Sequence, residues 1–264
     1  MTYDEILTAA IADFERFGFD SQERLEKWQM LLEQAAYAKS LQSGISAEEL
    51  KRKLNGIYTA QVGTGAIFKH HGISKFTIAK VKPKLHLELQ RRIMASANLI
   101  KLNRTEMIAS TIRRFAGWAS SIPAGGTGAI DKRETKQDIR KVLKSLPFTE
   151  RRVMIDQGAK FTASLNSIIA NENGAIAARW HSRWRAAGYE NYRREHRKRD
   201  KEIFIIRGNW AIEQGLIKLN GHQYTDEITM PGEEIYCSCT YEYLYNLRDV
   251  PELLTEKGKQ YVNQ

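Results

Sequence analysis

Helical apolar spacing over about the first two-thirds of the chain is the sequence feature that most constrains its fold. Between residues 3 and 17, apolar side chains recur every three or four positions, which places them on one face of a helix. Ser21 predicts the start of a second helix and Gly44 its end. The capping sequence Ser46-Ala47-Glu48-Glu49 predicts a third helix that extends to about Thr59. We therefore expect a helical N-terminal region.

The glycine-rich residues 61–75 separate these helices from a further series. Periodicity, caps and breakers predict helices at 83–102, 103–118, 132–145, 149–171 and 175–187. Asn103 with Glu106 is interpreted as the N-terminal cap of the second of these helices, and Thr149 as the cap of the fourth. Residues 122–128 (Ile-Pro-Ala-Gly-Gly-Thr-Gly) are predicted to form a loop.

The residue pattern changes after Gly188. Residues 202–207 are rich in β-branched and aromatic side chains, and residues 234–241 alternate as a strand does. Turn-forming residues lie between the two segments, at Gly215, Asn220-Gly221 and Pro231-Gly232, and a last short helix is expected from Pro251. The predicted fold class is mainly α, with a helical N-terminal region at 1–149 and a small α+β module at 150–264 that contains a short hairpin or sheet.

The net charge of +10 is distributed in blocks. Residues 1–50 carry four Lys or Arg against ten acidic residues, and residues 202–264 carry five against ten, which gives balances of −6 and −5. The middle, residues 51–201, carries 32 basic residues against 11 acidic ones, a balance of +21. This pattern indicates acidic ends for protein partners and a basic belt for a polyanion, with a merely solvated basic surface as the alternative.

The strongest local feature is the segment 179–201, which contains nine basic and three acidic residues with aromatic side chains between them. Arginine contacts phosphate oxygens with two N–H groups at once, and aromatic faces stack on bases or anchor a segment in the core. The residues predicted to contact nucleic acid or another acidic partner are Arg179, Arg183, Arg185, Arg193, Arg194, Arg197 and Lys198. In the alternative, Trp180 and Trp184 form a core stripe on one helix and the arginines are only solvated. We expect the tryptophans in the core and the arginines toward the partner.

The two cysteines, Cys237 and Cys239, exclude a disulfide framework. Strand alternation would place both thiols on one face, near enough to share a metal ion, and His196, His181 or His222 could complete such a site. Only one pair of ligands with metal-site spacing is present, so structural, buried cysteines are the favoured interpretation. No metal and no cofactor are predicted.

Neither an enzyme nor a membrane protein is predicted. Gly63-Thr64-Gly65 and residues 124–128 do not complete a nucleotide-binding fingerprint, and the serines, histidines and carboxylates show no catalytic spacing. No stretch of about 18 apolar residues is present, and the acidic N-terminus does not resemble a secretory signal.

The C-terminal part resembles the Mu F-like minor head proteins of tailed phages, also called head morphogenesis proteins. The ordered pieces that carry the resemblance are Trp180-His181-Ser182, then Arg193 to Asp200 (R-R-E-H-R-K-R-D), Ile203 to Trp210 (I-F-I-I-R-G-N-W), Met230-Pro231-Gly232-Glu233-Glu234, and Cys237-Ser238-Cys239. They extend over roughly residues 150–258. Two departures are Ser238, where the family commonly has arginine, and Lys201, where it has glycine. The lysine is expected to demand a different turn conformation.

The resemblance implies a structural protein of the virion head or neck, present in several copies per particle and in the host cytoplasm during assembly. The implied partners are the portal and other head proteins and, without sequence preference, double-stranded DNA. The implied task is head assembly, genome retention or DNA delivery. His196, Asp200, Cys237 and Cys239 look like residues that define the fold of the module. The alternatives are a metal-dependent nuclease that uses His196 and Asp200, with zinc held by the cysteines, and a DNA-binding protein that is absent from particles.

Overall fold

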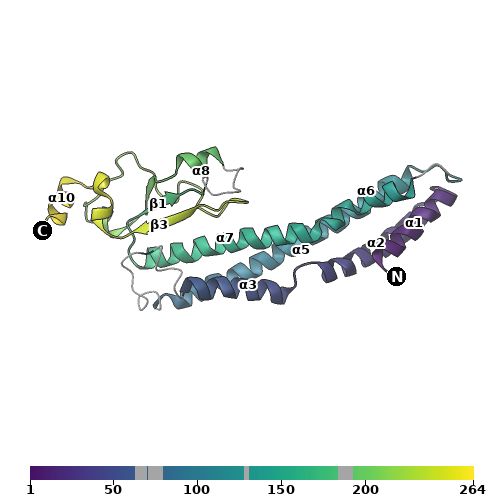
Figure 1. The fold of residues 1–264 in the computed structure, drawn as a ribbon, viewed down its shortest axis with the longest axis horizontal. Helices are drawn as coiled ribbons and strands as arrows, with labels where there is room; N and C mark the ends of the chain where they lie inside the picture. The colour runs from purple at the N-terminus through teal and green to yellow at the C-terminus, as the bar shows by residue number, and fades with distance from the viewer. Residues whose placement is uncertain (63–69, 71–79, 128–130, 184–192) are drawn as a thin grey trace. The chain divides into compact units, whose positions relative to one another are not determined.

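The computed structural model describes residues 1–62, 70, 80–127, 131–183 and 193–264. These residues are mainly helical, with one small antiparallel sheet near the C-terminus, so the predicted fold class is confirmed (Figure 1). They form two compact units. Unit 1 combines Met1–Leu50 with Ala95–Met154, and unit 2 combines Lys51–Met94 with Ile155–Gln264.

This division differs from the single boundary expected between residues 149 and 150. The boundary between the units falls inside three helices, α3 (Ala47–Ala60), α5 (Lys82–Ser120) and α7 (Leu146–Glu172). The first part of α5 belongs to unit 2, where Arg92 donates hydrogen bonds to Gln157 and Ser164 of α7, each at 3.1 Å. Contacts between residues about 70 positions apart therefore define the unit, and no local sequence signal marks them.

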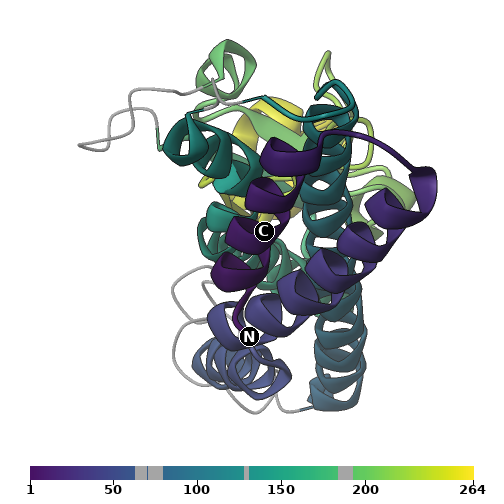
Figure 2. The same cartoon turned by 90° about the vertical axis from the view of Figure 1, so that its right-hand side faces the viewer.

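Unit 1 is built from α1 (Tyr3–Phe17), α2 (Gln22–Ser43), α6 (Lys132–Lys144) and parts of α5 and α7. The predicted ends of α1 and α2, drawn in purple in Figure 2, are confirmed. Ser21 accepts the Arg24 N–H as the N-terminal cap of α2. The core contains Phe14 of α1 and Phe115 of α5, whose ring centroids are 5.9 Å apart in an edge-to-face arrangement. Such packing between helix faces supplies most of the stability of an amphipathic helix.

A buried ion pair connects three segments of unit 1. The Glu150 carboxylate is fully buried and accepts hydrogen bonds from the Arg104 guanidinium at 2.8 and 2.9 Å. It also accepts the Ile45 N–H at 2.6 Å, at the connection between α2 and α3 (Ala47–Ala60). The carboxylate thus accepts three hydrogen bonds, and such partners offset the cost of burying its charge.

Two predicted helix boundaries were wrong. The break expected at Asn103 does not exist, because α5 continues from Lys82 to Ser120. Asparagine only weakens a helix, and the neighbouring residue Arg104 is held by Glu150. α7 begins at Leu146 and not after Thr149, because Pro147 in a first helical turn loses no intrahelical hydrogen bond. The loop expected at 122–128 is confirmed for the described residues 122–127.

Unit 2 contains a three-stranded sheet with β1 (Ala177–His181) between β2 (Ile203–Ile205) and β3 (Thr240–Leu244). Both pairings are antiparallel, and Ala178 lies opposite Phe204 on one side and Tyr243 on the other. One face packs into a cluster with the C-terminal elements α9 (Trp210–Glu213), η2 (Leu247–Asp249) and η3 (Pro251–Leu253), after which the chain ends in α10 (Glu256–Val262). The other face carries Trp180, Tyr241 and Tyr243 and packs on Ala170 of α7.

Two further expectations about this region were wrong. Within the helix expected at 175–187, residues 177–181 form β1 instead, because they pair with β3 and, at 177–179, also with β2. The strand expected at 234–241 starts only at Thr240, because Glu233–Tyr236 form a turn in which Tyr236 has a φ of 63°. The strand at Ile203–Ile205 is confirmed, as are the turns at Gly215, Asn220-Gly221 and Gly232, all of which have positive φ. Among the described residues, no helix is long and apolar enough to cross a membrane.

Candidate functional site

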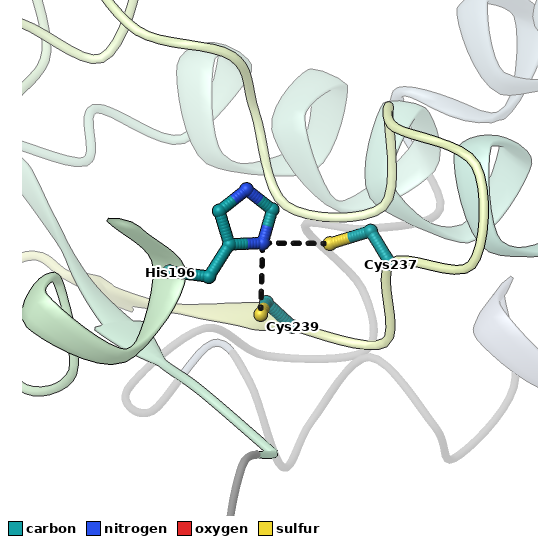
Figure 3. Close-up of side chains that lie close together, drawn as sticks. All are labelled: His196, Cys237 and Cys239. Carbon is teal, nitrogen blue, oxygen red and sulfur yellow. Dashed lines mark hydrogen bonds between the residues drawn. The ribbon is translucent and has the colours of Figure 1, made fainter. Parts of the chain in front are cut away.

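The only group of three or more His, Cys, Asp or Glu side chains that the described residues place in metal-binding proximity is His196, Cys237 and Cys239. His196 comes from the short helix α8 (Arg194–Lys198), and the cysteines come from the extended segment just before β3 (Figure 3). The His196 Nδ1 atom lies 3.6 Å from the Sγ atom of each cysteine. All three residues are at least 95% buried. The structure thus brings together three of the four residues expected to define the module.

The fourth expected residue, Asp200, holds the end of α8 against the sheet. Its Oδ1 atom accepts the Ser182 N–H at 2.8 Å, and the next residue, Lys201, donates its N–H to the Trp180 carbonyl at 2.7 Å. Lys201 has a φ of 70°, in the left-handed region that glycine favours. Lysine thus occupies a backbone conformation that carries strain for an L-residue. The hydrogen bonds to β1 keep the turn that glycine would adopt.

The His196 ring is fixed from two sides. Trp180 of β1 meets it edge-on, with the ring centroids 5.2 Å apart. On the side away from the sulfur atoms, the Glu234 carboxylate lies 3.6 Å from Nε2 and is itself paired with Arg193 at 2.6 Å. The carboxylate on this side favours the tautomer that carries its proton on Nε2, which leaves the Nδ1 lone pair directed at the two sulfur atoms.

The two thiols differ in acidity. A hydrogen bond from Cys239 lowers the pKa of Cys237, and the Gly232 N–H, 3.3 Å from its Sγ atom, acts in the same direction. The same thiol–thiol hydrogen bond, together with burial, raises the pKa of Cys239. Gly232 has a φ of 84°, so the Pro231-Gly232 turn places its N–H toward the sulfur atom. One thiolate is thus stabilised inside the module.

Two of the three histidines that the sequence offered as partners for the cysteines lie elsewhere. His181 Nε2 is 2.9 Å from the Glu242 carboxylate, and His222 Nδ1 is 3.0 Å from the Ile203 carbonyl. His196 is therefore the histidine that the fold brings to the cysteines. The soft donor set of two sulfur atoms and one imidazole suits Zn²⁺ better than Mg²⁺ or Ca²⁺.

The predicted basic residues are not all placed alike. Arg194, Arg197 and Lys198 are exposed on α8, next to Arg193, which is exposed and paired with Glu234. Arg179 lies in β1 and pairs with Glu242 at 3.1 Å, whereas Arg183 is exposed. Arg185 and Trp184 lie outside the described residues, and so does Gly63-Thr64-Gly65. The structure thus groups Arg193, Arg194, Arg197 and Lys198, which we call the α8 cations. Trp180 is fully buried, as expected of a core tryptophan, although it lies on a strand.

Sequence analysis missed a second buried histidine. His70 is fully buried and stacks on the Tyr243 ring with centroids 5.1 Å apart. Its ring nitrogens lie 2.5 Å from the Tyr245 hydroxyl and 3.1 Å from the Asn166 side-chain oxygen. Burial raises the pKa of both tyrosines. Asn166 and Tyr245 lie 96 and 175 residues from His70 along the chain, so no local sequence pattern could have indicated this cluster.

No protein-family model matches this chain, and no match was found among curated proteins or solved structures. The resemblance to the Mu F-like minor head proteins therefore rests on the ordered residues given above.

Proposed function

We propose that this chain is a structural minor head protein of a tailed phage that acts near the portal and contacts packaged double-stranded DNA. The observation that carries the proposal is the exposure of the α8 cations on a segment whose backbone is anchored by buried residues. The ordered motifs that resemble the Mu F-like module surround this same segment. The acidic ends of the chain, with balances of −6 and −5, suit contacts with other head proteins.

The chemistry of the α8 cations favours binding without sequence preference. Arginine and lysine side chains on an exposed five-residue helix can reach phosphate oxygens, and phosphate contacts carry no base information. If Arg194, Arg197 and Lys198 each neutralise one phosphate, DNA affinity falls about 40-fold between about 50 and 200 mM salt. A protein that contacts whatever genome is packaged needs this kind of binding.

The DNA contact is tested by charge reversal on α8. In Arg194→Glu/Arg197→Glu/Lys198→Glu, we expect the slope of log affinity against log salt concentration to become less steep by about 3. The matched control Lys218→Glu/Lys257→Glu/Lys259→Glu alters the net charge equally at exposed positions of the acidic C-terminal part, and its slope should stay close to that of the unaltered protein. Equal slopes for the two variants would contradict a DNA contact at α8.

The structural role is tested on particles. Quantitative mass spectrometry of purified, nuclease-treated virions should give a fixed ratio of this protein to the portal subunit, near or below one. Absence from particles that contain portal and capsid protein would reject a virion role. It would favour the DNA-binding protein that remains in the host cytoplasm.

The nuclease alternative receives less support from the geometry. Asp200, which that alternative pairs with His196 in catalysis, is bound to the Ser182 N–H, and the cysteines are 4% and 5% exposed. A hydrolytic metal needs a water molecule that reaches the substrate. Plasmid nicking that is abolished by chelator and by His196→Gln would reverse this preference.

A further inference from the structure

The two buried cysteines share a third neighbour, the Nδ1 atom of His196. Cys237 and Cys239 meet one nitrogen atom at the same distance, 3.6 Å, and the donor atoms of all three residues lie within 4.8 Å of one another. A single hydrogen on Nδ1 can point at only one of the two sulfur atoms. Equal distances from one nitrogen to two sulfur atoms also fit an ion that all three donor atoms share.

We propose that His196 Nδ1 and the Sγ atoms of Cys237 and Cys239 bind one Zn²⁺ ion that fixes α8 to the segment before β3. This inference is independent of the phage role proposed above, because it rests on the side-chain geometry alone.

The observed distances match those of tetrahedral zinc. Zinc–sulfur bonds of about 2.3 Å and zinc–nitrogen bonds of about 2.0–2.1 Å at tetrahedral angles give a sulfur–nitrogen separation of about 3.6 Å. Both Nδ1–Sγ separations have this value. Among the described residues, no other His, Cys, Asp or Glu joins the group, so these residues supply three of the ion's ligands.

The surrounding groups suit a metal centre as well. A histidine that binds metal through Nδ1 carries its proton on Nε2, and a carboxylate commonly holds that proton. The Glu234 carboxylate occupies this side of the ring, 3.6 Å from Nε2, and is held there by Arg193. The Gly232 N–H points at the Cys237 sulfur atom, as N–H groups do toward metal-bound thiolates.

The position of the site explains what the ion would do. His196 is 41 residues from Cys237 and 43 from Cys239, so the ion joins segments that are distant in sequence. With the ligands almost fully buried, the ion has a structural role and holds α8, with its exposed cations, against the sheet.

Metal content and cobalt spectroscopy test the proposal. Full-length protein without an affinity tag, purified in the absence of chelators, should contain about one zinc per chain by mass spectrometry of the metal. Replacement of the zinc by Co²⁺ should give sulfur-to-cobalt charge-transfer bands in the near ultraviolet and strong visible bands, which report thiolate ligation in a tetrahedral field.

The variants assign the ligands. Cys237→Ser/Cys239→Ser should lose the zinc and the charge-transfer bands, and His196→Gln should lose at least nine-tenths of the zinc. The control His222→Gln should retain both, because His222 contacts a backbone carbonyl away from the cluster. If the ligand variants fail to fold, the cobalt spectrum of the unaltered protein still decides. Less than about one-tenth of a zinc per chain, with no charge-transfer bands on Co²⁺ addition, would overturn the proposal.

Discussion

Lys201→Gly is expected to stabilise the protein, because the turn after α8 has a backbone conformation that suits glycine. Lys201 has a φ of 70° and its side chain is exposed. An L-residue in the left-handed region costs about 1–2 kcal/mol relative to its preferred conformations. Removal of the β-carbon relieves this cost, and the N–H that Lys201 donates to the Trp180 carbonyl is kept.

The unfolded state reduces the gain. Glycine has more conformational freedom than lysine in the unfolded chain, which returns about 0.4–1 kcal/mol. The expected net increase in the free energy of unfolding is therefore about 0.5–1 kcal/mol. For a cooperative unit of this size, that increase corresponds to a rise in Tm of about 1–4 °C.

Urea unfolding followed by circular dichroism measures the difference. Lys201→Ala removes the same side-chain charge but keeps the β-carbon, so it should show no gain. Lys198→Gly, at an exposed position of α8, should cost about 1 kcal/mol, because glycine in a helix is unfavourable. A Lys201→Gly protein no more stable than Lys201→Ala would refute the reasoning about the turn.

Three further predictions concern charge and metal. Glu150→Gln should lower the free energy of unfolding by about 3–5 kcal/mol, because it leaves the Arg104 charge unpaired in the interior. In urea titrations, a loss below about 1 kcal/mol would contradict the buried ion pair. The hydrogen bond from Lys39 lowers the pKa of Asp4 below its usual 3.8. The ion pair therefore stabilises the folded protein above pH 3.8, and this stabilisation is lost as the pH falls through the lower pKa of the folded state. Asp4→Asn should therefore cost at most about 1 kcal/mol at neutral pH and nothing in strong acid, as thermal unfolding at the two pH values will show. A zinc chelator should lower the Tm of the unaltered protein and leave that of Cys237→Ser/Cys239→Ser unchanged; an equal shift in both would argue against metal at these thiols.

Local signals predicted the first helices well and the sheet poorly. Ser21 and Gly44 mark the ends of α2 correctly because capping depends on residues within one turn. The helix expected at 175–187 includes Ala177 and Ala178, which have high helix propensity, but pairing with β2 and β3 decides their conformation. The periodicity of a short segment cannot indicate that β1 will pair with β3, about 60 residues further along the chain.

The candidate site was predicted in part. The spacing of Cys237 and Cys239 indicated neighbouring thiols, and His196 stood among three candidate partners. The fold selects His196 because α8 directs it inward toward Trp180. The sequence predicted the turn that directs the Gly232 N–H to Cys237, but it placed Glu234 in a strand, so the position of its carboxylate beside His196 was not expected.

The central place of β1 has a consequence for folding during synthesis. Arg179 of β1 pairs with Glu242 of β3, 63 residues further along the chain. Arg92 of α5 forms its hydrogen bond with Gln157, which is synthesised 65 residues later. Because the ribosome synthesises the chain from the N-terminus, unit 2 cannot complete its sheet until β3 has emerged from the ribosome. High sequence separation of contacts slows folding and exposes unpaired strand edges meanwhile. We therefore expect nascent chains that stop before Thr240 to be captured by chaperones or degraded, even though most of their helices have already been made.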